Sequence, residues 1–547
     1  MGLAVGVLGF KEKGTMSGYD YVIVGSGTAG ATLAARLTED PSCRVLVLEA
    51  GGPDRNFWLK VPVGYYKAIY NSTFSHLYRS EPDPGIAGRR MDCPRGRVIG
   101  GSSSINGLIF IRGQHDDFDD WARLGADGWD HASVLPHFRT LETYSGPASQ
   151  SRGAHGPLQI SDLRNHNPVC DAWLQAGREA GLPDNPDFNG DSAYGIGSYQ
   201  LTLRGRWRDS AATAFLKPAM GRPNLTVKLR AHVTGLLFKG SRAYGVTYHQ
   251  NGTLHEAIAD SEVILSGGAV QTPQLLQLSG IGPAKLLGDL GIKVRHDAPG
   301  VGENLQDHIQ MRTIVELAEK GQSLNDHMRN PISLAKMGFE WLFRGSGPLS
   351  VGAGQVGGAM CTKYAEGGRP DIQLFVMPLS VDKPGKPLHS YSGFTTSFWQ
   401  CHPESRGSIR INSTDPKADP TIRMNYLSEQ RDRDVTIEGL KLLRDIYRQP
   451  SFRKLWSREV IPGDTFQTDD EIMDAIRANA TTVYHLVGTC RMGNDAHAVV
   501  DPQLRVNGVE GLRVVDASVM PKITSANTNA ATYMIAEKAS TIIRYGH

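Results

Sequence analysis

Apolar residues near the start of the chain come in short runs that predict two buried strands separated by a helix. Residues 21–24 form an apolar run, as expected for a buried strand of a parallel sheet. A helical stretch with Leu33 and Leu37 one turn apart follows, and a second apolar run, residues 44–48, ends in Glu49. This order of strand, helix and strand predicts the first unit of an α/β fold.

Between the first strand and the helix lies the glycine-rich sequence Gly-Ser-Gly-Thr-Ala-Gly. Gly25 permits a tight turn, Gly27 lets the backbone approach a pyrophosphate, and Gly30 lets helix and strand pack closely. The free N–H groups of the helix N-terminus hold phosphates, and Glu49 can accept hydrogen bonds from a ribose. The pattern predicts a dinucleotide site rather than a purely structural turn, and it does not decide between NAD and FAD.

Later segments extend this pattern along the chain. Residues 96–107 are rich in glycine and serine, which favours a backbone pressed against a flat ligand or a phosphate over an ordinary surface loop. Residues 268–282 directly follow an apolar strand at 263–265. Residues 514–518 predict another strand that runs into a turn, and a helix around 534–543 closes the chain.

The composition is that of a globular protein with little net charge. The 547 residues are enough for two joined domains, and 58 Lys and Arg nearly balance 56 Asp and Glu. Because no basic field is present, we expect a small substrate and no nucleic-acid partner. The six cysteines lack metal-type spacing, so we expect reduced thiols and no metal site.

No stretch is long and apolar enough to span a membrane, and the N-terminus does not resemble a signal peptide. We therefore expect a cytoplasmic location, with peripheral membrane contact as an open alternative. Residues 1–16 are expected to form a disordered extension. Residues 337–343 are apolar and aromatic, which favours a core helix over a contact with a membrane or quinone.

Taken in order, the segments at 25–30, 96–107 and 268–282 resemble the glucose-methanol-choline (GMC) family of flavoprotein oxidoreductases, most of all its choline-dehydrogenase-like and aliphatic-alcohol-dehydrogenase branch. The resemblance implies an α/β fold. A Rossmann-type FAD-binding domain, discontinuous in sequence, joins an α+β substrate-binding domain built on an antiparallel sheet. The implied FAD-binding segments are 17–159, 215–310 and 485–547, and the implied substrate-binding segments are 160–214 and 311–484.

The same resemblance implies which residues hold FAD. Val233 is expected to touch adenine through its backbone, and Asn529 is expected near the pyrimidine edge of the flavin. Some members attach FAD through a histidine at the position of Ile105, and because isoleucine cannot form that bond we expect non-covalent FAD. The implied cofactor-binding residues are Gly25, Gly27, Thr28, Ala29, Gly30, Glu49, Ala50, Val98, Gly101, Ser102, Asn106, Gly107, Ile109, Val233, Tyr484, Asp516, Ala517 and Asn529.

The stretch TTVYHLVGTCRMG, residues 481–493, is expected to carry the catalytic histidine. His485 is one of 17 histidines, and the resemblance singles it out although Leu486 replaces the proline that usually follows. The implied partner is Asn527, where relatives have histidine or asparagine. An amide cannot take a proton near neutral pH, so Asn527 only hydrogen-bonds the substrate oxygen. The alternative is an asparagine that caps the last helix.

These residues predict the oxidation of an alcohol to an aldehyde or ketone. His485 removes the hydroxyl proton while hydride passes to flavin N5, because the developing carbonyl needs the electrons of the oxygen. Oxygen, a quinone or another carrier then reoxidises the flavin. Three alternatives stay open: a flavin-containing lyase without net redox, an NAD-dependent dehydrogenase, and a non-enzymatic flavin-binding protein. The alcohol is also open, with choline as one candidate beside aliphatic, aromatic and polyether alcohols.

Overall fold

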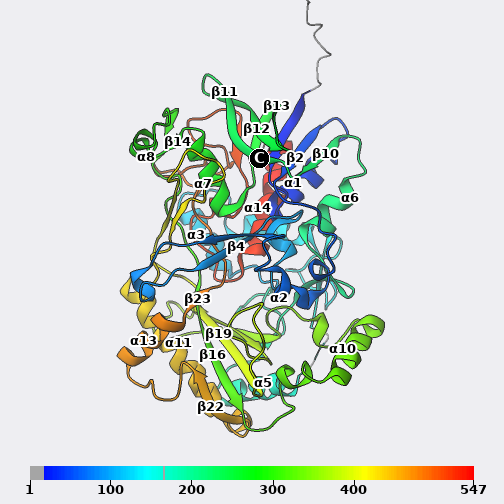
Figure 1. The fold of residues 1–547 in the computed structure, drawn as a ribbon, viewed down its shortest axis with the longest axis vertical. Coiled ribbons are helices and arrows are strands. Elements are labelled where there is room, and N and C mark those ends of the chain that lie inside the picture. Colours follow the sequence, from blue (N-terminus) through cyan, green and yellow to red (C-terminus); the bar gives the residue numbers. More distant parts are fainter. Residues whose placement is uncertain (1–17, 164, 166, 547) are drawn as a thin grey trace, which may run out of the picture.

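The computed structural model describes residues 18–163, 165 and 167–546. The extension expected at 1–16 lies outside these residues. The chain folds around two large β-sheets, one in the upper and one in the lower half of Figure 1.

The upper sheet contains the strands that the apolar runs predict. Its parallel part has the order β10 (Leu225–Leu229), β2 (Val45–Glu49), β1 (Tyr19–Val24) and β13 (Thr253–Leu265), and β24 (Leu512–Val514) also pairs with β13. All five residues of β2 are buried, as expected for a strand covered on both faces. Because parallel strands share a carboxyl edge, β1, β2 and β13 all end beside the same space.

One strand connects two kinds of sheet in the upper half. Residues 253–258 of β13 pair with β12 (Arg242–Gln250) in an antiparallel ribbon that also contains β11 (His232–Lys239). Residues 259–265 of the same strand pair with β1. The ribbon is thereby fixed rigidly to the parallel sheet.

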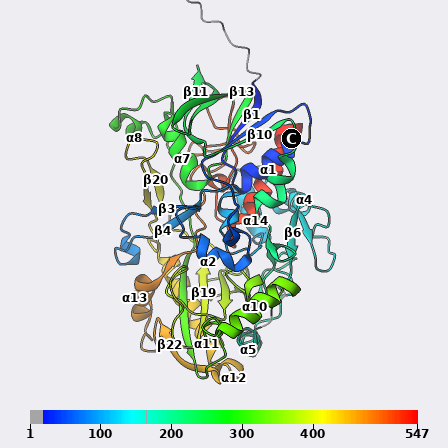
Figure 2. The same ribbon diagram turned by 45° about the vertical axis from the view of Figure 1, so that its right-hand side comes forward.

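The first and last long helices of the upper half pack against each other. They are α1 (Thr28–Leu37) and α14 (Thr528–Tyr545), and Arg36 donates to Glu537 at 2.9 Å across the contact. Their N-termini carry the glycine loop and the segment around Asn527, so the two ends of the chain meet here (Figures 1 and 2). The other main helices are α3 (His115–Arg123), α4 (His131–Leu141), α5 (Pro168–Glu179), α7 (Gly268–Leu278), α8 (Ala284–Asp289), α10 (Pro331–Arg344), α11 (Gln430–Arg448) and α13 (Asp469–Asn479).

The lower sheet is antiparallel along its whole path. In order across the sheet its strands are β22 (Trp456–Ile461), β16 (Ile309–Leu317), β19 (Gly393–Gln400), β18 (Ile372–Met377), β17 (Val356–Met360) and β7 (Gly195–Ser198), with β23 (Thr481–Thr482) also paired to β16.

Alternate residues of this sheet face two different environments. Leu374 and Phe398 belong to the core cluster under α11, where Gly439 allows the helix to approach Phe398 closely. Phe375 and Trp399, one residue further along each strand, belong to a separate cluster on the opposite face. This period-two alternation leaves one face to bind α11 and the other to line a site.

The predicted fold class is confirmed: a Rossmann-type parallel sheet is joined to an α+β part with an antiparallel sheet. The six cysteines are free thiols, as expected. The domain boundaries stay a prediction, and β16 runs across the expected boundary at residue 310. Within the described residues, no helix combines the length and hydrophobicity needed to cross a bilayer.

The expectation of a core helix at 337–343 is wrong. These residues belong to α10, which lies at the periphery of the lower half (Figures 1 and 2). Only Met337 and Trp341 of this helix are buried, whereas Phe343 is 65% exposed. Apolar spacing alone cannot tell which face of a helix meets the protein.

Replacing Gly30 by alanine tests the contact between α1 and β1. A Cβ atom at Gly30 would lie 2.0 Å from the carbonyl oxygen of Gly25, so the glycine loop has to shift. We expect Gly30→Ala to lower the free energy of unfolding by about 1–3 kcal/mol and to reduce cofactor content, measured by denaturation and by flavin absorbance. The matched control is Gly288→Ala on α8, where a Cβ meets nothing within 4 Å. Equal stability and cofactor content in Gly30→Ala and the control would contradict the prediction.

Candidate active site

A cavity of about 480 Å³ lies between the two sheets. Its wall contains the glycine loop of α1 at one end and residues 481–486 at the other. Every residue implied for the cofactor lines it except Gly30 and Val98, and so do His485 and Asn527. Gly30 packs instead against the glycine loop, and Val98 is a core residue whose backbone pairs with that of Gly52.

Glu49 is fixed at the nucleotide end of the cavity by the glycine loop itself. Its Oε2 accepts hydrogen bonds from the backbone N–H and the hydroxyl of Ser26, both at 2.8 Å, and its Oε1 accepts from the N–H of Gly51 at 2.7 Å. Burial raises the pKa of this carboxyl. The remaining lone pairs of the two oxygens can accept hydroxyl donors, as a ribose site requires.

The middle of the cavity is formed by close backbone approach and by Asp516. A Cβ at Gly101 would lie 2.7 Å from the Cα of Gly27, so these two loops meet without side chains. Asp516 accepts from the N–H of Gly268 at 2.8 Å and from the hydroxyl of Thr272 at 2.6 Å. Near them the hydroxyl of Thr28 donates to Asn529 at 2.7 Å, which joins the starts of α1 and α14.

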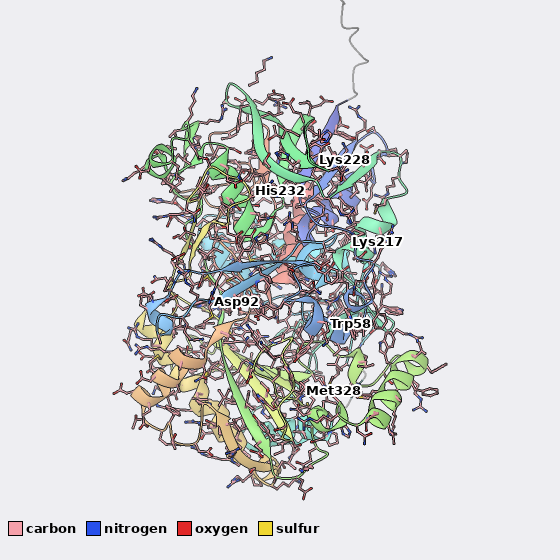
Figure 3. All side chains as sticks on the ribbon, viewed as in Figure 1. Trp58, Asp92, Lys217, Lys228, His232 and Met328 are labelled. Atoms are coloured by element: carbon pink, nitrogen blue, oxygen red, sulfur yellow. The ribbon has the colours of Figure 1, made fainter. Side chains whose placement is uncertain are left out.

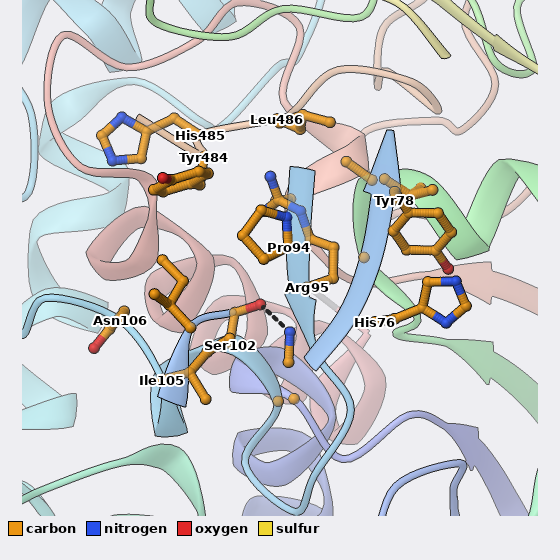
Figure 4. A pocket seen from close by; sticks show the side chains of 18 of the residues that line it. His76, Tyr78, Pro94, Arg95, Ser102, Ile105, Asn106, Tyr484, His485 and Leu486 are labelled. Carbon is orange, nitrogen blue, oxygen red and sulfur yellow. Dashed lines mark hydrogen bonds between the residues drawn. The ribbon is translucent and has the colours of Figure 1, made fainter. Parts of the chain in front are cut away.

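The donors around this cavity fit a dinucleotide. Helix α1 starts at Thr28 with no side-chain cap, so the N–H groups of its first turn are open to phosphate oxygens. Two nitrogens of Arg95, Nε and Nη2, and the hydroxyl of Ser266 are buried without a partner, and both residues line the cavity. In Figure 4, Ser102 accepts from the N–H of Gly96, and Ile105 lies near it.

The loop that carries His485 is held by one buried carboxylate. Asp307 accepts from the backbone N–H of His485 at 2.7 Å and from the hydroxyls of Thr482 and Tyr426. Tyr484 adopts a left-handed conformation, with φ of +68°, that non-glycine residues rarely occupy. Its hydroxyl is bonded to that of Tyr70 at 2.7 Å. These contacts set the position of the imidazole.

The register of the lower sheet brings His308 to the same place. Ile309, the first residue of β16, pairs with Thr482, and the N–H of Val483 donates to the carbonyl of His308 at 3.1 Å. As a result the Nδ1 atoms of His308 and His485 are 3.0 Å apart. His308 does not line the cavity, so it acts on the site through His485.

The tautomers of both rings follow from one carbonyl group. Nε2 of His308 is 3.0 Å from the carbonyl oxygen of Cys401, which can only accept, so this nitrogen carries the proton. Burial lowers the pKa of His308 to about 3, so the ring is neutral and its Nδ1 is an acceptor. His485 must therefore donate from its own Nδ1, which leaves its Nε2 unprotonated and able to accept a hydrogen bond.

Nε2 of His485 faces Asn527, whose amide nitrogen is 3.1 Å away. Burial, the neighbouring His308 and the cationic Arg95 lower the pKa of His485 well below its ordinary value, so the ring is neutral and able to accept a proton. Asn527 occupies the N-cap position of α14, yet its side chain makes no capping hydrogen bond. Its Oδ1 is buried without a partner, so the amide serves the cavity rather than the helix.

Neither Asp307 nor His308 is among the site residues that the sequence predicts. Both residues lie in the segment VGENLQDH, immediately before the apolar strand β16. An acid and a histidine immediately before a buried strand could have indicated that both belong to an active site. Their partners were not visible, because they come from residues 401, 426 and 482–485.

Comparison with known proteins identifies the family. The model for GMC oxidoreductase matches residues 19–310, and the C-terminal model of the same description matches residues 403–536. The chain belongs to the GMC oxidoreductase family. GMC oxidoreductases are FAD flavoproteins, so this protein is an FAD-dependent oxidoreductase, as the sequence predicts. The alternative of an NAD-dependent dehydrogenase is thereby excluded.

Relatives of this GMC oxidoreductase cover nearly its whole length. It is 40% identical to the oxygen-dependent choline dehydrogenase of Chromohalobacter salexigens, over 96% of this chain and 95% of the relative. Identity to the mitochondrial choline dehydrogenase of Homo sapiens is 41%, over 96% of this chain and 90% of the relative. Identity to the alcohol dehydrogenase (acceptor) of Pseudomonas putida is 40%, over 96% of this chain and 95% of the relative.

Solved structures agree with this assignment. Pyridoxine 4-oxidase from Mesorbium loti superposes with a TM-score of 0.86 at 31% identity, over 97% of this chain and 99% of the other. A variant formate oxidase of Aspergillus oryzae superposes with a TM-score of 0.90 at 27% identity, over 98% of this chain and 99% of the other.

The His308 contact predicts a specific defect. In His308→Ala the Nδ1–H of His485 loses its acceptor, so the ring can turn or take the other tautomer. We expect the anaerobic rate of flavin reduction by substrate to fall about 10- to 100-fold, as found for groups that orient metal-bound imidazoles. His308→Asn, whose amide oxygen can accept the same proton, should recover part of the rate. An unchanged rate in His308→Ala, at wild-type FAD content, would contradict this role.

Proposed function

We propose that this GMC oxidoreductase oxidises the CH–OH group of a small alcohol to an aldehyde or ketone, with His485 as the base. The observation that supports this is the unprotonated Nε2 of His485, which faces Asn527 at the wall of the cavity. When bound, FAD supplies an acceptor for the hydride that leaves the alcohol carbon.

The protein residues then carry the proton chemistry. The hydroxyl of the alcohol replaces the amide of Asn527 as the donor to Nε2 of His485. The amide N–H of Asn527 donates to the alcohol oxygen and holds it as negative charge develops there. His308 accepts the hydrogen bond from Nδ1 throughout, so the ring keeps its orientation while it becomes an imidazolium.

Removal of the base tests this mechanism. We expect His485→Ala to retain FAD and to lose about 10²- to 10⁴-fold in the rate of anaerobic flavin reduction by alcohol, followed as bleaching of the yellow colour. Chemical reduction of the same variant with dithionite is the control, because it needs no base. Near-normal bleaching by alcohol would remove His485 from this role. A wild-type protein that no alcohol bleaches would favour the lyase alternative instead.

We also propose that FAD is held without a covalent bond. Ile105 fills the position from which some family members attach the flavin, and it lines the cavity with a side chain that cannot form such a bond. Acid precipitation is expected to release all of the FAD into the supernatant, measured by its absorbance. A yellow pellet would contradict the proposal.

An uncharged alcohol fits the cavity better than a quaternary ammonium. Phe375 and Met377 lie on one face of β18 and line the cavity, and Phe375 is linked to His485 through Trp399 by ring contacts of 5.6 and 5.9 Å. Among the described residues, four carboxylates line the cavity: Glu49 and Asp516 are held by the nucleotide-binding loops, Asp92 pairs with Lys383, and Asp382 contacts His389.

Choline is the second candidate substrate. Its support comes from the aromatic rings of Tyr65, Tyr70 and Tyr484 along the cavity, which can stabilise a cation, and from the choline dehydrogenases among the relatives.

Choline and its uncharged isostere 3,3-dimethylbutan-1-ol separate the two candidates, because they share size and shape. We expect kcat/KM for the isostere to equal or exceed that for choline. A preference for choline of about 10-fold or more would identify the cation as the feature recognised.

Parallel assays with oxygen and with an artificial quinone acceptor show which of them takes the electrons. The cytoplasmic location stays a prediction that cell fractionation can test.

A further inference from the structure

The outward face of α10 is apolar where a surface helix should be polar. Met337 and Trp341 face the protein, whereas the opposite side of the helix carries Ile332, Ala335, Phe339, Leu342 and Phe343, all exposed. Ile332 is 80% exposed and Phe339 is 58% exposed. We call these five residues the α10 face. A contiguous apolar surface of this kind marks a binding surface rather than ordinary exposure.

Three exposed aromatic side chains from elsewhere in the chain cluster beside Trp341, at the flank of α10 that meets the protein. Trp207 packs against Trp341 with ring centroids 5.0 Å apart, and Phe57 packs against both of them. Trp58 follows Phe57, and all three of Phe57, Trp58 and Trp207 are between 41% and 51% exposed. Figure 3 shows Trp58 on the side of the molecule that carries α10. Tryptophan at the edge of an apolar surface is typical of proteins that meet a membrane interface.

The charges around the α10 face are mostly positive. Residues 329–344 contain Arg329, Lys336 and Arg344, all exposed, and one acid, Glu340. Glu340 accepts a hydrogen bond from the hydroxyl of Ser346 at the C-terminal end of the helix. Lys336 lies at the edge of the face, where its chain can lie along apolar surface while its ammonium group reaches outward.

Segments next to the α10 face in sequence continue to residues that line the catalytic cavity. The segment that begins at Phe57 and Trp58 continues through α2 (Tyr65–Ala68), whose Tyr65 lines the cavity. The segment that leaves α10 passes through a short helix, η6 (Pro348–Ser350), and reaches the cavity at Ala353.

We propose that the α10 face, with Phe57, Trp58 and Trp207, docks this enzyme on the surface of an anionic lipid bilayer. Helix α10 has 14 residues, about 21 Å, so it lies in the plane of the interface. The basic residues favour lipid phosphates over a second copy of the chain, because a symmetric contact would bring the same positive groups of two copies together. The proposal concerns docking and does not depend on the substrate or on His485.

The test is sedimentation of the FAD-loaded enzyme with vesicles of phosphatidylcholine and phosphatidylglycerol, compared with phosphatidylcholine alone. We expect the wild type to bind the anionic vesicles and the double variant Phe339→Ser/Phe343→Ser to lose at least about 10-fold in affinity. Lys336→Glu should weaken binding to the anionic vesicles alone. The matched control is Leu254→Ser on β13, where the leucine is 57% exposed and lies in the other half of the molecule. All variants should keep wild-type activity on a water-soluble alcohol.

A second measurement needs no variant. Vesicles that contain brominated lipid should quench the tryptophan fluorescence of the wild type, because Trp58 and Trp207 would lie at the interface. A wild type that stays in the supernatant with both lipids, or a double variant that binds as well as Leu254→Ser, would overturn the proposal. A wild-type dimer that the double variant dissolves, without vesicle binding, would make the α10 face a contact between copies instead.

Discussion

The carbonyl oxygen of Cys401 can only accept hydrogen bonds, and the chemistry of the site depends on this constraint. It fixes the proton of His308 on Nε2, which makes Nδ1 of that ring an acceptor. His485 must then donate from Nδ1, and its Nε2 is left free toward the cavity. A backbone group outside the cavity lining thereby fixes which nitrogen of His485 is unprotonated.

This arrangement needs the two sheets to meet at their ends. The upper sheet places the glycine loop and Glu49 at the carboxyl edge of β1 and β2, where a dinucleotide binds. The lower sheet places His308 at the start of β16, beside the loop that follows β23. Neither half forms the cavity alone, which explains why its lining residues come from distant parts of the chain.

Much of the fold could be predicted from local pattern. The strand, glycine loop and helix at residues 19–37 follow from apolar runs and turn chemistry, and the structure has them there. Other features depend on tertiary context. The contact of His308 with His485 joins segments far apart in sequence, and the exposure of α10 depends on which side of that helix meets the protein.

The position of α14 has a further electrostatic consequence. This 18-residue helix begins at Thr528, directly after Asn527, so the positive end of its macrodipole lies at the edge of the reaction space. A positive field there stabilises a negatively charged oxygen and destabilises a protonated imidazole. In the proposed mechanism this field would favour the alkoxide form of the alcohol oxygen while the alcohol reacts.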